Sequence, residues 1–160
     1  MVPSPSLDVG GWDGSFAATW LGDRPPLDVG LDISPVRTAH SERAYRRVVA
    51  GDAQSLPFEA ASFNGVLCNS VIEHIPDDIA VVRECGRVLR PGGVLLLTTP
   101  SIYFHEFLYG VRRARERNDE PAAQAYIGGI DKRLHHLHYR SLSDWEDILA
   151  EASMTLVSSS

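Results

Sequence analysis

The chain has 160 residues, a length that suits one domain with a hydrophobic core of its own. Hydrophobic residues make up 44% and charged residues 22%, which is ordinary for a soluble globular protein, and the formal net charge of -6 argues against a nucleic-acid backbone as the main partner. The longest apolar run, near Val94–Leu97, is far too short to span a bilayer, and the N-terminal residues do not form a secretory signal.

Five strands are expected, at Leu7–Gly10, Leu27–Ile33, Arg47–Ala50, Val66–Asn69 and Val94–Thr98. Helices are expected between them, at Ser15–Leu21, from Ser34-Pro35 to about Tyr45, and at Asp77–Leu89. Strands that alternate with helices predict an α/β fold with a doubly wound, mostly parallel sheet. In that order the strand at Leu7–Gly10 is central, and the second and fourth strands lie on either side of it.

The segment Tyr103–Ile130 interrupts this alternation. Its apolar residues Phe104, Phe107, Leu108 and Val111 fall on one helical face. Two interpretations stay open: a lid or insertion at about residues 102–141, or a helix that packs along the sheet edge. Beyond it we expect a helix at Ser143–Ala152 and a sixth strand that starts at Met154–Val157.

The two cysteines, Cys68 and Cys85, lie in an expected strand and an expected helix. Neither has the spacing of a metal ligand set. They therefore predict reduced thiols in the core of a cytoplasmic protein.

A glycine turn and an acidic strand end are the most informative pair of motifs. The first strand runs into Leu7-Asp8-Val9-Gly10-Gly11-Trp12-Asp13-Gly14, and the second ends in Val29-Gly30-Leu31-Asp32-Ile33-Ser34. Glycines let backbone amides approach a ligand, and an acid at the next strand tip can accept hydrogen bonds from both ribose hydroxyls. The pair predicts a pocket for an adenosine-containing cofactor, either a dinucleotide or S-adenosylmethionine.

Three further motifs follow in order: Gly51-Asp52-Ala53-Gln54-Ser55-Leu56-Pro57-Phe58, then Asn69-Ser70-Val71-Ile72-Glu73-His74, then Arg90-Pro91-Gly92-Gly93. Together with the first two, they make the chain resemble the class I S-adenosylmethionine-dependent methyltransferases, in particular the type 11 small-molecule group. The resemblance covers about Leu7 to Ser101. It implies a Rossmann-like fold, S-adenosylmethionine as cofactor, and methyl transfer to a small-molecule acceptor.

The resemblance also assigns cofactor-binding residues: Asp8, Gly10, Gly14, Asp32, Ile33, Asp52, Ala53 and Asn69. It implies that Asp32 takes the ribose hydroxyls, with Ile33 against the adenine ring. Asp52 would accept a hydrogen bond from the adenine amine, near the Ala53 amide. The simpler interpretations are an acid at a helix N-terminus for Asp32 and a turn-forming residue for Asp52.

Trp12 departs from the family pattern, since the family has glycine at this place between Gly10 and Gly14. The indole would fill the cofactor pocket or displace the turn. The ends are also short, without a helix before the first strand or a closing seventh strand. These departures keep an alternative open, a degenerate methyltransferase-fold binding or regulatory protein. A nicotinamide-dependent oxidoreductase is a weaker alternative, because the G-x-G-x-x-G fingerprint is absent.

Histidines supply the remaining candidates. His74 is a candidate general base, and the simpler interpretation is that it fixes its loop through a backbone hydrogen bond. His135 and His138 are candidates for substrate contact, since their segment borders the acceptor pocket in relatives. The spacing of His135, His136 and His138 does not match a helical zinc site, so no metal site is predicted.

Overall fold

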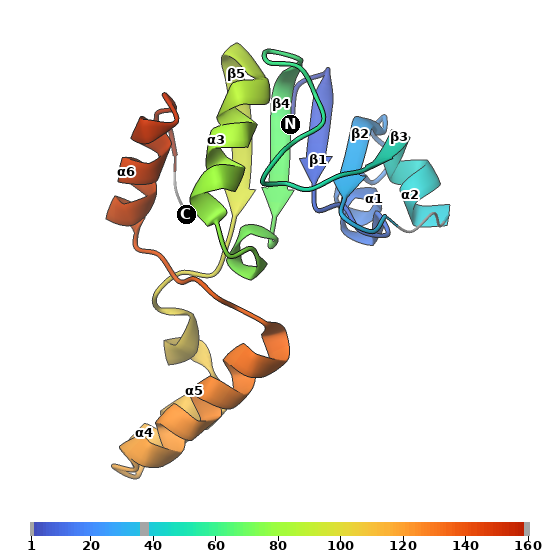
Figure 1. Ribbon diagram of the computed structural model, residues 1–160. Helices are drawn as coiled ribbons and strands as arrows, with labels where there is room; N and C mark the ends of the chain where they lie inside the picture. The colour runs from blue at the N-terminus through green and yellow to red at the C-terminus, as the bar shows by residue number, and fades with distance from the viewer. Residues whose placement is uncertain (1, 36–38, 159–160) are drawn as a thin grey trace.

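The computed structural model describes residues 2–35 and 39–158. Its centre is a five-stranded parallel sheet in the order β3-β2-β1-β4-β5 (Figure 1). The strands are β1 (Ser6–Val9), β2 (Leu27–Asp32), β3 (Tyr45–Ala50), β4 (Phe63–Asn69) and β5 (Leu89–Thr98). The helices are α1 (Ser15–Leu21), α2 (Ala39–Ala44), α3 (Asp78–Val88), α4 (Tyr109–Glu116), α5 (Glu120–Leu134) and α6 (Leu142–Glu151), with short 3-10 helices η1 (Ile72–His74) and η2 (Phe104–Phe107).

The first strand is central, as the sequence predicts. Leu7 pairs with Val29 of β2 on one side and with Val66 of β4 on the other. All four residues of β1 are buried, which fits a parallel strand with both faces covered. The predicted α/β, doubly wound parallel sheet is therefore confirmed.

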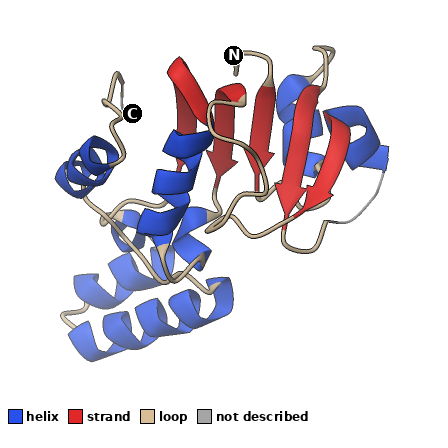
Figure 2. Cartoon of the chain, turned by 45° about the horizontal axis from the view of Figure 1, so that its top comes forward, coloured by secondary structure: helices blue, strands red, loops and turns tan. Residues whose placement is uncertain are grey.

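Helices cover the two faces of the sheet (Figure 2). Val66 and Cys68 belong to a core shared with α3 and α6, while Leu67 between them joins a second core shared with α1 and α2. This alternation follows from the two-residue period of a strand. Both cysteines are free and buried, as predicted. None of the described helices has the length and apolar character needed to cross a membrane.

Two expected elements near the chain's middle and end differ. The start of the helix expected from Ser34-Pro35 falls partly on residues 36–38, outside the described residues, and α2 ends at Ala44. Tyr45 opens β3 because its buried ring packs against the glycine turn. The expected strand at Met154–Val157 is wrong: the Met154 amide instead donates to the Leu149 carbonyl and closes the end of α6.

The segment after β5 forms η2 and then a hairpin of α4 and α5, not one helix. The predicted apolar face is wrong, because Val111 is buried whereas Phe107 is 80% exposed. Leu108 has an extended backbone that separates η2 from α4, and Asn118 turns the chain with a φ of 56°. The hairpin projects beyond the carboxyl ends of the strands and does not pack along the sheet edge (Figure 1).

Candidate functional site

The glycine turn after β1 is fixed by both backbone conformation and packing. Gly10 and Gly14 have φ values of 78° and 76°, in the region that favours glycine. A Cβ atom on Gly10 would lie 2.3 Å from Val71 Cγ2, and one on Gly14 would lie 2.7 Å from Ser41 Cα. The Gly10 amide donates to the Leu31 carbonyl at 2.8 Å. The turn is therefore held closely against β2 and the segment after β4.

Asp8 lies inside the protein beneath this turn. It is 4% exposed, and its Oδ2 accepts a hydrogen bond of 2.6 Å from the Tyr45 hydroxyl. Burial raises the pKa of Asp8 to about 7; the Tyr45 bond opposes this shift and the charge of Asp32 adds to it. A Cβ on Gly11 would lie 2.5 Å from the Tyr45 hydroxyl oxygen. Asp8 and Tyr45 thus support the turn from below.

Asp32 joins the turn to the tip of β2. Its Oδ2 accepts from the Trp12 amide at 3.0 Å, and its Oδ1 accepts from the Ser34 amide at 2.9 Å. A carboxylate has about four lone-pair sites, so each oxygen can accept one more hydrogen bond. Ile33 beside it is 77% exposed. An acceptor pair next to an exposed apolar side chain fits a ribose with its attached base.

Asp52 lies beside Asp32, since the Gly51 amide donates to the Asp32 carbonyl at 3.0 Å. Its Oδ1 accepts from the Gln54 amide at 2.8 Å, which is the turn-forming role weighed above. The side chain is nevertheless exposed, so a carboxylate oxygen can also take an external donor. Ala53 is buried in the core and anchors this loop.

Asn69 ends β4 beside β1. Its Oδ1 accepts from the Thr98 hydroxyl at 2.6 Å. That bond orients the amide, and it leaves the two N–H donors of the side chain for a ligand.

Trp12 lies at the open side of the turn. Its φ is 40°, which is unusual for a residue with a side chain, and it is 62% exposed. The indole is therefore not part of the core. Whether it obstructs or contacts a cofactor remains a prediction.

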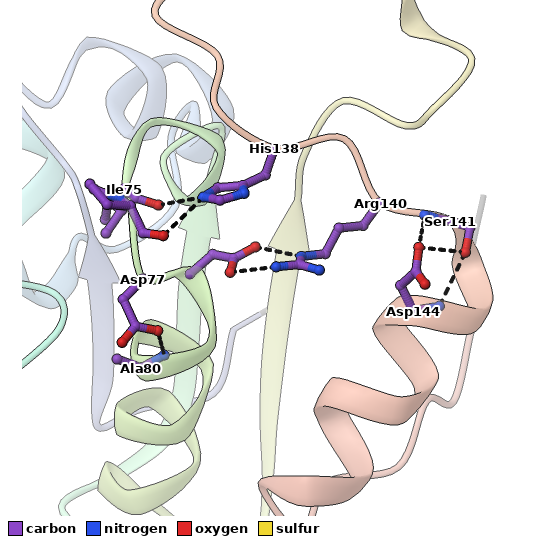
Figure 3. Close-up of polar contacts among 9 residues, drawn as sticks. Ile75, Asp77, Ala80, His138, Arg140, Ser141 and Asp144 are labelled. Atoms are coloured by element: carbon purple, nitrogen blue, oxygen red, sulfur yellow. Dashed lines mark hydrogen bonds and ion pairs between the residues drawn. The ribbon is translucent and has the colours of Figure 1, made fainter.

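A second group of side chains forms where the loop after α5 meets η1. The His74 Nδ1–H donates to the His135 carbonyl at 3.2 Å, and the Leu137 amide donates to the Glu73 carbonyl at 2.8 Å. His138 Nε2 lies 3.0 Å from the Ile75 carbonyl oxygen (Figure 3). His74 thus makes the backbone bond weighed above, and His138 fixes the loop. The substrate role of His135 and His138 stays a prediction.

Glu73 and His136 were not selected from the sequence. Glu73 is 2% exposed, and its Oε2 has no hydrogen-bond partner among the described residues. Burial raises the pKa of Glu73 and lowers the pKa of His136. The His74 and His136 rings lie 5.1 Å apart. The sequence spacing could not show that Glu73 and His136 lie near each other, because the α4–α5 hairpin separates their segments along the chain.

An ion pair anchors the same loop to α3. Arg140, which Figure 3 labels, donates from Nε and Nη2 to the two oxygens of Asp78 at 2.5 and 2.7 Å. The Asp78 side chain is 3% exposed. Asp77 caps α3 by accepting from the Ala80 amide at 2.9 Å. The segment from His135 to Arg140 is thereby held against the carboxyl edge of the sheet.

Similar proteins were found at the levels of sequence and structure. Residues 7–97 match the family described as Methyltransferase domain, type 11. The chain is 44% identical over 99 residues to the ubiquinone biosynthesis O-methyltransferase of Xanthomonas campestris pv. campestris, covering 58% of this chain and 41% of the relative. It is 27% identical over 150 residues to the ubiquinone biosynthesis O-methyltransferase of Idiomarina loihiensis, covering 88% and 56%. The chain thus spans about half the length of these relatives.

Solved structures share the fold. The phosphoethanolamine N-methyltransferase 2 of Haemonchus contortus, in complex with phosphomonomethylethanolamine and S-adenosylhomocysteine, has a TM-score of 0.66 at 20% identity, over 94% of this chain and 33% of that one. The YcgJ protein of Bacillus subtilis has a TM-score of 0.61 at 24% identity, over 92% and 60%. The match over more than half of the chain, on the fold and motifs described above, shows that the protein belongs to the class I S-adenosylmethionine-dependent methyltransferases of the type 11 group.

Proposed function

We propose that the chain binds S-adenosylmethionine at the carboxyl edge of the sheet and transfers its methyl group to a small-molecule acceptor. The observation that carries this proposal is Asp32, which accepts one backbone hydrogen bond from Trp12 of the glycine turn and one from Ser34, and keeps lone pairs available at the tip of β2. The relatives named as methyltransferases support the same activity.

The residues present fit this cofactor. Asp32 would accept the two ribose hydroxyls, and the exposed Ile33 would cover one face of the adenine. Asp52 would accept from the adenine amine, next to the Ala53 amide, and the Asn69 side-chain amide would donate toward the methionine carboxylate. Asp8 stays beneath the turn and acts through Tyr45, so we propose that it positions Gly10 and Gly14 and does not itself touch the cofactor.

Methyl transfer requires little further chemistry from the protein. The cofactor supplies a methyl group already activated as a sulfonium, so the protein's main task is to align the acceptor and exclude water. His74 is the candidate base for an acceptor that arrives protonated. Its Nδ1 donates to the His135 carbonyl, so its Nε2 is the nitrogen that can take a proton.

The α4–α5 hairpin and its flanking loops, at about residues 102–141, are proposed to cover the acceptor. Their place beyond the carboxyl ends of the strands supports this role (Figure 1). So do the hydrogen bonds that hold the loop after α5 against η1. We further propose a cytoplasmic location, which the free, buried Cys68 and Cys85 support.

The test is calorimetric titration of the chain with S-adenosylhomocysteine. We expect saturable binding at one site, and much weaker binding by Asp32→Ala. NADH serves as the control ligand and should not bind. Absence of S-adenosylhomocysteine binding by a folded protein would favour the degenerate alternative. Activity would then be followed by methyl release from S-adenosylmethionine in the presence of candidate phenolic and amine acceptors.

A further inference from the structure

We infer that Glu73, His74 and His136 form a binding site for one divalent transition-metal ion of the Zn²⁺ class. One ligand atom from each residue lies within 4.8 Å of the other two. The proposal goes beyond methyl transfer and does not rest on it. An ion bound through His74 Nε2 would occupy the lone pair that the proposed base role of His74 uses, so these two roles of His74 are alternatives. Neither the histidine spacing in the sequence nor the family resemblance predicts this set.

The first support is the buried carboxylate. Glu73 is 2% exposed, and its Oε2 makes no hydrogen bond with any residue that the structure describes. A buried polar atom without a partner is costly, and a buried charge is retained when it is paired or coordinates a metal. A cation between Glu73 and the two imidazoles would remove this cost.

The second support is the tautomer that the hydrogen bond of Nδ1 selects for the neutral His74 ring. Its Nδ1 lies 3.2 Å from the His135 carbonyl oxygen. A carbonyl only accepts, so Nδ1 carries a proton, and in the neutral ring the lone pair is then on Nε2. A metal-binding histidine usually donates its other ring N–H in this way, which fixes both the tautomer and the ring orientation.

His136 has the same arrangement through a longer relay. The Tyr139 hydroxyl donates its only proton to Asp131 Oδ1 at 2.5 Å. The Tyr139 oxygen can therefore only accept from His136 Nδ1, at 2.9 Å. His136 Nε2 is left with its lone pair, as in His74. Asp131 is itself held by His105 Nε2 at 2.8 Å. The set is thus two oriented imidazoles and one carboxylate oxygen. Within the described part of the chain, neither the two Nε2 atoms nor this oxygen has a hydrogen-bond partner.

The chemistry of this set selects the ion. Imidazole nitrogens with one carboxylate suit Zn²⁺, Co²⁺ or Ni²⁺, whereas Mg²⁺ and Ca²⁺ prefer oxygen ligands. Tetrahedral zinc holds ligand atoms about 3.3 Å apart, from metal–ligand distances of about 2.0–2.1 Å. Closing the set from its present spread requires movements of about an ångström at the ends of side chains. Three protein ligands leave a fourth position for water.

The experiment is a titration of the metal-stripped full chain, without cofactor, so its failure is separate from a failure of the proposed function. Co²⁺ is followed by its d–d absorption, and Zn²⁺ by calorimetry. We expect one equivalent of either ion to bind, with Zn²⁺ displacing Co²⁺ and excess Mg²⁺ displacing neither. His136→Ala and Glu73→Gln should each weaken binding by more than about a hundredfold, because loss of outer-shell partners alone costs about 10–100-fold. Asp131→Asn, which touches only the relay, should fall within that smaller range.

His135→Ala is the matched control, because this exposed neighbour of His136 contributes only its backbone carbonyl to the set. It should bind like the parent. Circular dichroism establishes whether each variant is folded. If Glu73→Gln does not fold, His136→Ala still tests the metal site, because His136 is only half-buried and lies in a loop. No stoichiometric binding by the parent would overturn the inference. So would unchanged binding by His136→Ala, or equal loss in His135→Ala, since the ion would then be held by other histidines.

Discussion

Asp32 shows how one side chain can support the fold and still be available to the proposed cofactor site. Its two oxygens each accept a backbone amide, from Trp12 and from Ser34, and so fix the turn relative to β2. Each oxygen keeps a lone pair that can accept from an external donor. Asp52 also accepts a local amide, from Gln54, but its loop is anchored mainly by the buried Ala53 and Leu56. The two acids therefore differ in how much of the site depends on them.

Asp32→Ala should weaken S-adenosylhomocysteine binding more than Asp52→Ala does. Each hydrogen bond to a charged acceptor contributes about 1.5–3 kcal/mol, so the loss of two ribose bonds should raise the Kd at least about a hundredfold. The loss of one bond at Asp52 should raise it about tenfold. Calorimetry measures both values, with Asp23→Ala, a fully exposed acid after α1, as the control. If the parent and the three variants bound S-adenosylhomocysteine with equal affinity, the assignment of the cofactor pocket to Asp32 and Asp52 would be wrong.

Trp12→Gly is expected to tighten binding of S-adenosylhomocysteine. Glycine accommodates the φ of 40° without the cost of about 1–2 kcal/mol that a side chain brings in the left-handed region, and it clears the open side of the turn. Trp12→Ala separates the two causes, since it removes the ring and keeps Cβ. The Kd of each variant is compared with that of the parent. Tighter binding by the parent would instead make the indole a cofactor contact.

At the level of elements, the regular strand–helix alternation was predictable and the inserted segment was not. The strands were predictable from runs such as Leu27–Ile33 and Val66–Asn69. In the structure these runs belong to β2 and β4, whose residues are buried or half-buried. In the α4–α5 hairpin the two helices pack mainly against each other. The apolar periodicity of this segment therefore did not indicate a helix face that packs on the sheet. The strand expected at Met154–Val157 failed because its first amide completes α6. A local sequence pattern does not show which hydrogen bond a given backbone amide will form with another element.

Arg140→Met should destabilise the fold by about 3–5 kcal/mol, because it leaves the buried Asp78 carboxylate without its partner. The loop after α5 would lose its anchor on α3 at the same time. Urea unfolding measures the change in the free energy of unfolding. Arg83→Met is the matched control: its ion pair with Glu151 is exposed at both ends, so it should cost less than about 1 kcal/mol.

A double variant tests the cause. Asp78→Leu combined with Arg140→Met removes both charges, and it should recover much of the lost stability. A single Arg140→Met variant as stable as the parent would show that Asp78 is satisfied by other groups.

For the molecule as a whole, the sequence predicts which strand ends gather at the carboxyl edge of the sheet, but it does not predict that Glu73 and His136 lie close together. Asp32 and Asn69, which we propose to bind the cofactor, could be placed near each other from the sequence because they end strands whose carboxyl ends must meet at one edge of a parallel sheet. Asp8 lies within β1 and supports the turn from below. Glu73 was visible only as part of a motif, and His136 only as one of three neighbouring histidines. Their proximity depends on a return of the chain after α5, which is a tertiary property that no spacing encodes.

The stability of the whole molecule should depend on pH through Asp8. Its pKa is about 7 in the folded protein, against 3.8 when unperturbed. Between these values the folded state retains a proton that the unfolded state has lost, so this contribution to stability falls as pH rises from 4 to 7, by up to about 1.4 kcal/mol per pH unit, and is constant above. The lowered pKa of His136 acts in the opposite direction below 6.5, and the raised pKa of Glu73 acts in the same direction as Asp8.

Comparison with Asp8→Asn separates the contribution of Asp8 to the pH dependence of stability from the contributions of the other titratable groups. Asparagine keeps an acceptor for the Tyr45 hydroxyl and does not titrate. The parent's free energy of unfolding, relative to that of the variant, should fall by roughly 2–3 kcal/mol between pH 5 and pH 8. The lowered pKa values of Asp28 and Glu84 act below this window, and they are common to both proteins. Parallel stability curves from urea unfolding would show that Asp8 ionises at its ordinary pKa, and that the carboxylate beneath the glycine turn is charged in the folded protein throughout this range.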